Sequence, residues 1–68
     1  MFIELTEITT TGITAGIKRQ ITINTNRIIC FYTPETGKGT TIEVKRGHIR
    51  VSDSYDEIKE LIAWQHYQ

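Results

Sequence analysis

This sequence has few of the covalent or metal-based means by which very small proteins are stabilised. Its 68 residues include one cysteine, Cys30, so an internal disulfide is excluded. The two histidines do not cluster with cysteine at the spacing of metal ligands, so we expect no metal site and no cofactor. A chain this short buries only about 60% of its unfolded surface. The composition therefore favours self-association as a source of stability.

The sequence also lacks a long apolar run. Its longest uninterrupted apolar segment, residues 28–32, is far shorter than the roughly 20 residues that span a bilayer. Residues 1–4 contain no basic region and no apolar core, so we expect no signal peptide. These features predict a cytoplasmic protein with no membrane partner.

Net charge is absent, but the charges are unevenly distributed. Eight basic residues balance eight acidic ones, which disfavours a general polyanion binder. Residues 17–50 nevertheless carry seven Lys/Arg against two Glu, and the two ends carry the compensating negative charge. The segment therefore offers candidate nucleic-acid-binding residues, with Phe31 and Tyr32 nearby as stacking aromatics: Arg19, Arg27, Lys45, Arg46 and Arg50. We favour the alternative of a solvated face whose charges protect edge strands.

Isoleucine and threonine are abundant and predict a mostly β body. Twelve Ile and eleven Thr occur, nearly all before the last fifteen residues, and both types are β-branched. Alternating apolar and polar residues predict a strand over Phe2–Ile8 and a long one over residues 13–24, bent at Gly16. The alternative for the second segment is two strands broken near Lys18 and Arg19.

The next segments predict a turn, a strand and a loop. Asn24 and Asn26 favour a tight turn. Ile28–Tyr32 is short and apolar, which is typical of a central strand, and Cys30 within it is expected to be buried. Residues 33–39 hold the single proline and two glycines and predict a loop. A phosphate-binding loop over residues 36–41 is excluded because Gly39 follows Lys38, where Ser or Thr is required.

The chain is organised around residues 40–65, which predict a β-hairpin leading into a helix. A turn over Arg46 and Gly47 would place β-branched residues on one face and an opposite-charge pair on the other. The predicted pairs are Val44 with Ile49, Ile42 with Val51, Glu43 with Arg50, and Lys45 with His48.

After Val51 the apolar period changes from that of a strand to that of a helix. Ser54 and Glu57 have the spacing of a capping box, and Asp53 and Asp56 add negative charge at the helix N-terminus. The residues predicted to face the sheet share one stripe: Tyr55, Ile58, Leu61, Ile62 and Gln65.

The end of this helix carries the candidate partner-binding residues. Trp64 and Tyr67 lie just off the predicted core stripe. We expect them to cover the core, and the alternative is an exposed anchor for a partner, since Trp and Tyr are enriched at interfaces.

Three segments together have the pattern of a known family: residues 3–8, residues 21–28, and residues 42–44 with the Gly47 turn and residues 54–58. They resemble the small flagellar FlbD-type proteins, also called swarming-motility protein SwrD. The resemblance implies a non-enzymatic accessory role through binding to a larger assembly, and it carries over no catalytic residues. This chain differs from the family in its longer first loop and in its expanded loop over residues 33–39.

The sequence as a whole predicts one α+β domain over residues 1–68. We expect a curved antiparallel sheet of four or five strands, alternatively a partly open barrel, with one C-terminal helix. No carboxylate pair lies in an apolar sequence setting that would suit acid–base catalysis, so we expect no enzyme and no small-molecule substrate. The predicted function is a small interaction protein that binds itself or a larger protein. A nucleic-acid-binding module ranks second.

Overall fold

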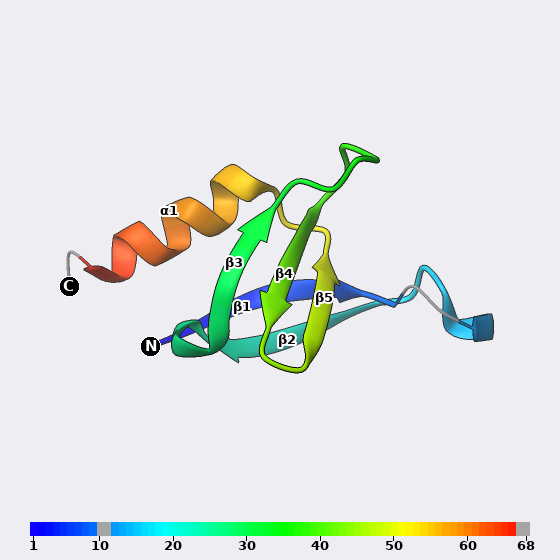
Figure 1. Ribbon diagram of the computed structural model, residues 1–68, viewed down its shortest axis with the longest axis horizontal. Coiled ribbons are helices and arrows are strands. Elements are labelled where there is room, and N and C mark those ends of the chain that lie inside the picture. Colours follow the sequence, from blue (N-terminus) through cyan, green and yellow to red (C-terminus); the bar gives the residue numbers. More distant parts are fainter. Residues whose placement is uncertain (10–11, 67–68) are drawn as a thin grey trace.

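The computed structural model describes residues 1–9 and 12–66 as one α+β unit. Five antiparallel strands form a single open sheet in the order β2-β1-β5-β4-β3, and one helix follows them (Figure 1). The elements are β1 (Phe2–Ile8), η1 (Gly12–Thr14), β2 (Lys18–Asn24), η2 (Thr25–Arg27), β3 (Ile28–Tyr32), β4 (Thr40–Val44), β5 (Gly47–Val51) and α1 (Tyr55–His66). The predicted fold class is confirmed.

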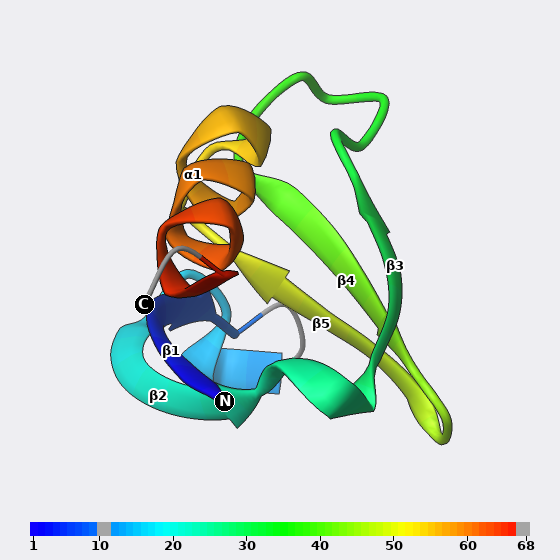
Figure 2. The same cartoon turned by 90° about the vertical axis from the view of Figure 1, so that its left-hand side faces the viewer.

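The sheet bends sharply where β1 meets β5. Strands β1 and β2 pair along seven residues, whereas β1 and β5 pair only at Glu7 and Val51. One further backbone hydrogen bond, from Ser52 N to Thr6 O at 2.8 Å, extends that narrow junction. The β1–β2 hairpin therefore crosses the β3–β4–β5 sheet instead of continuing it (Figures 1 and 2). Strands β2 and β3 stay as two edges, so the barrel does not close.

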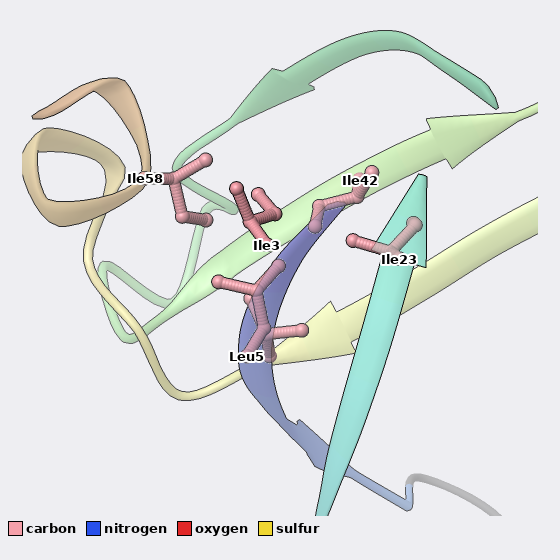
Figure 3. Close-up of a cluster of buried hydrophobic side chains, with 6 residues drawn as sticks. Ile3, Leu5, Ile23, Ile42 and Ile58 are labelled. Atoms are coloured by element: carbon pink, nitrogen blue, oxygen red, sulfur yellow. The ribbon is translucent and has the colours of Figure 1, made fainter. Parts of the chain in front are cut away.

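The core fills the space inside this bend. Alternation along β1 directs Ile3 and Leu5 inward, and Ile58 reaches them from the helix (Figure 3). The buried apolar residues are Ile3, Leu5, Ile23, Ile42, Val51 and Ile58. Half-buried residues extend this cluster: Ile21, Ile28, Phe31, Val44, Ile49 and Ile62.

Asp53 joins three elements at the β5–α1 connection. Its Oδ1 accepts a hydrogen bond from Thr6 N at 2.8 Å, and its carbonyl oxygen accepts one from Thr40 Oγ1 at 2.7 Å. Both groups are partly buried, where an unpaired polar group is costly. Asp53 therefore ties β1 and β4 to the start of the helix, a role that its position before the N-cap did not reveal.

The predicted capping box is confirmed. Ser54 N donates to Glu57 Oε1 at 3.2 Å, and Glu57 N donates to Ser54 Oγ at 3.1 Å. The predicted apolar stripe is only partly covered, because Ile58 and Ile62 pack on the core while Leu61 is 37% exposed. The side chain of Gln65 lies outside what the structure describes.

The predicted hairpin register is wrong by two residues. The observed pairs include Ile42 with Ile49 and Glu43 with His48, so the two-residue turn is Lys45 and Arg46. The predicted turn needs a positive φ at Arg46, which is strained for a residue with a Cβ atom. The observed turn avoids that strain, since among the described residues only glycines have positive φ, and Gly47 takes φ 150°. A two-residue shift keeps every side chain on its predicted face.

The long strand predicted over residues 13–24 is also wrong, in both of its versions. The strand begins only at Lys18, and the segment before it forms η1 and a turn within a long hairpin loop. Ile13 is fully exposed and Ile17 is largely so. The loop closes through hydrogen bonds from Thr9 N to Ile17 O at 2.9 Å and from Gly16 N to Thr9 O at 2.7 Å.

Strand β3 forms as predicted but lies at the edge of the sheet, so its central placement is wrong. Its pairing with β4 shifts between Ile28 and Cys30, and this irregularity leaves Ile29 and Cys30 exposed. The prediction of a buried Cys30 is therefore wrong. The loop over residues 33–39 is confirmed. Across the described part of the chain, no helix is long and apolar enough to cross a membrane.

Candidate binding groove

A groove lies beside the β4–β5 turn, where two separate parts of the chain, residues 23–29 and residues 44–49, meet. It has a volume of about 880 Å³. The end of β2, the short helix η2, the start of β3 and the β4–β5 turn all contribute to its walls. Its apolar residues are Ile23, Ile29, Val44 and Ile49, and its polar residues are Asn26, Arg27, Lys45 and Arg46. We call this set the basic groove.

Local sequence explains why Arg27 reaches the groove. Asn24 caps η2, because its Oδ1 accepts a hydrogen bond from Asn26 N at 3.0 Å, which confirms the predicted turn. Thr25 N donates to Met1 O at 2.9 Å and so holds this turn against the start of β1. Arg27 therefore lies at the end of a short, capped turn whose backbone is fixed at both ends.

The β4–β5 turn supplies the other two cations. Lys45 and Arg46 occupy the two turn positions, and both side chains are exposed. Across the groove, the shift in the β3 ladder leaves Ile29 exposed by 69%. The groove thus combines an apolar surface with three cationic side chains at its polar margin.

These three cations have no carboxylate at ion-pair distance within the part of the chain that the structure describes. The single ion pair found there joins Arg19 Nε to Glu7 Oε1. Charges of one sign beside low-dielectric apolar walls strengthen the local field. The basic groove is therefore suited to a ligand that presents both carboxylates and apolar side chains.

The five predicted basic residues do not form one face. Arg27, Lys45 and Arg46 come together in the basic groove. Arg19 lies on β2 in its ion pair with Glu7. Arg50 lies on β5, close enough to Tyr32 for its positive charge to favour the phenolate. The predicted basic sheet face is therefore corrected to a three-residue cluster.

The predicted stacking aromatics are engaged elsewhere. The Phe31 ring lies 5.2 Å from the Tyr55 ring, centroid to centroid, so it packs between the sheet and α1. Tyr32 Oη donates to Glu43 Oε1 at 2.8 Å, and this bond raises the pKa of the Tyr32 phenol above its usual value. Neither Phe31 nor Tyr32 lines the basic groove.

A second surface lies on α1 and is acidic. Glu57, Glu60, Leu61 and Trp64 have the spacing of one helix face, and together with Ala63 they line a shallow hollow of about 560 Å³. Trp64 is 63% exposed, so the prediction that it covers the core is wrong. Tyr67 lies outside the described residues. We call these five lining residues the acidic helix face.

The described residues include no group of three His, Cys, Asp or Glu side chains placed to hold a metal ion. No protein-family model matches the chain, and comparisons with curated proteins and with solved structures give no significant match. The resemblance to FlbD-type proteins and the absence of enzymatic activity therefore stay predictions.

Proposed function

We propose that this chain is a small non-enzymatic interaction module, and that its basic groove binds an acidic protein segment with exposed apolar side chains. One observation carries the proposal: Arg27, Lys45 and Arg46 lie beside an apolar surface in a single groove, with no ion-pair partner among the residues that the structure describes. An apolar surface gives affinity, and the charges select and orient an acidic partner. The module is proposed to act in the cytoplasm, in an accessory role of the kind that the FlbD resemblance implies.

The residue types that line the basic groove favour a protein ligand over single-stranded nucleic acid. Sequence-tolerant binding of single strands depends on aromatic side chains on which bases stack. The residues that line the groove include no aromatic ring, whereas four of the eight are aliphatic. Nucleic acid is accordingly the alternative that the following experiment discriminates.

The test uses fluorescence anisotropy with two labelled probes. One is a synthetic peptide that repeats Glu at helical spacing with Leu and Trp, and the other is an oligothymidylate. We expect the peptide to bind, and the double variant Arg27→Glu, Arg46→Glu to bind it at least about tenfold more weakly, since two attractive contacts become repulsive. The matched control is Lys38→Glu, which makes the same type of charge change in the exposed loop.

Three results would overturn this proposal. The first is no peptide binding at low salt, and the second is equal weakening by the control variant. The third is tight, salt-sensitive binding of the oligothymidylate that the double variant abolishes, which would establish the nucleic-acid alternative. A peptide in which Gln replaces every Glu should bind weakly, because it lacks the charges that the basic groove selects.

A further inference from the structure

The chain itself carries a segment with the chemistry that the basic groove fits. The acidic helix face presents Glu57 and Glu60 beside Leu61 and Trp64. We propose that the acidic helix face of one copy docks in the basic groove of a second copy. This inference rests on the proposed function, because it names the occupant of the same groove.

The two surfaces complement each other in charge and in apolar character. The basic groove offers three cations around exposed Ile29 and the half-buried Val44 and Ile49. The acidic helix face offers carboxylates around Leu61 and a Trp64 side chain that is mostly exposed. Tryptophan anchors of this kind dominate the energetics of many protein interfaces. Desolvating the Trp64 ring against the aliphatic side chains of the groove would supply affinity, and the charges would set the orientation.

The two surfaces line separate hollows of one copy and share no lining residue. The helix α1 and the β4–β5 turn lie at different ends of the fold in both views (Figures 1 and 2). The proposed contact joins different surfaces of two copies. It closes into a dimer if a two-fold rotation makes it reciprocal, closes into a larger ring at other closing rotations, and otherwise extends into an open chain.

The edges of the sheet are less suited to self-association. Lys18 and Arg19 lie on the edge strand β2, and charged side chains on an edge strand oppose its pairing with another edge. The other edge strand, β3, has an irregular ladder between Ile28 and Cys30 that disturbs regular strand addition. Docking of the helix into the basic groove uses side chains and requires no backbone pairing at either edge.

The decisive experiment is molar mass by light scattering behind size exclusion, from micromolar to millimolar concentration. Wild type should reach the mass of a dimer or more at the upper end. A groove variant, Arg27→Glu with Arg46→Glu, and a face variant, Glu60→Gln with Trp64→Ala, should each stay monomeric, with the contact weakened at least about tenfold. Their equimolar mixture should give a one-to-one dimer and nothing larger, because it contains one intact groove and one intact helix face.

The dimer formed by the mixture also shows that both variants are folded. The control Lys38→Glu should assemble like wild type. A wild-type monomer at every concentration would overturn the inference, and so would oligomers that persist in both variants. Neither result would contradict the proposed function, because peptide binding by the basic groove is measured in a separate experiment at micromolar concentration.

Discussion

Replacing Ile58 with alanine would test how the helix is held to the sheet. Among the side chains of α1 that the structure describes, Ile58 is the one in the buried core cluster, and Ile62 only packs against its margin. Truncating a fully buried Ile removes apolar contacts and leaves a cavity, at a cost of about 2–5 kcal/mol. A domain of this length has a free energy of unfolding of roughly 3–10 kcal/mol. The variant should therefore lose a large fraction of its stability.

The matched control is Leu61→Ala, one helical turn further along. Leu61 is 37% exposed and lies at the border of the acidic helix face, so little cavity can form and the cost should be about 1 kcal/mol. Urea unfolding followed by circular dichroism, at micromolar concentration, measures both losses. Equal losses in the two variants would refute the conclusion that Ile58 is the main anchor of the helix in the core.

Three further predictions concern single contacts. Gly39→Ala should lower the urea midpoint, because the new Cβ would lie 2.2 Å from a β5 carbonyl oxygen at a φ of +69°; an unchanged midpoint would contradict this packing. Asp53→Ala leaves Thr6 N unpaired and should cost about 1–3 kcal/mol in thermal unfolding, whereas a neutral effect would show that the bond is dispensable. Glu43→Gln should lower the pKa of Tyr32 in an absorbance titration, since the Glu43 carboxylate raises that pKa through its hydrogen bond. Because the pKa of Tyr32 is higher in the folded state, its contribution to stability is present below pH 10.0 and is lost as pH rises through the folded pKa.

Features set by neighbouring residues could be predicted from the sequence. The capping box of Ser54 and Glu57 and the Asn24 turn depend on hydrogen bonds that span two or three residues. Their geometry follows from residue type and spacing alone. The single α+β sheet-and-helix architecture follows from the change of apolar period after Val51.

The register and the extent of strands could not be predicted in the same way. A two-residue slip of the β4–β5 hairpin preserves the alternation, so the apolar pattern does not distinguish the two registers. Backbone strain at the turn decides between them, and Gly47 takes its φ of 150° as the first residue after the turn instead of as the second residue of the turn. Similarly, Ile13 and Ile17 alternate with polar residues although they lie in a loop that is closed by backbone hydrogen bonds to Thr9.

The groove depends on contacts between distant parts of the chain, which explains why only part of it was predicted. Arg27 lines the same groove as Lys45 and Arg46 because β3 pairs with β4, although seventeen residues lie between Arg27 and Lys45 in the sequence. Cys30 is exposed on β3, which lies at the edge of the sheet. Trp64 is exposed because α1 packs on the core through Ile58 and Ile62, which lie on another side of the helix. No local sequence pattern indicates the edge position of β3 or which side of α1 packs on the core.

The emission spectrum of Trp64 tests the central claim most directly, because the chain has one tryptophan. At micromolar concentration the exposed indole should emit at long wavelength, and the emission should move to shorter wavelength as concentration rises and the ring enters the basic groove of a second copy. The shift should be absent in the Arg27→Glu, Arg46→Glu variant. An emission spectrum that never changes, or a shift that persists in that variant, would contradict the pairing of the basic groove with the acidic helix face.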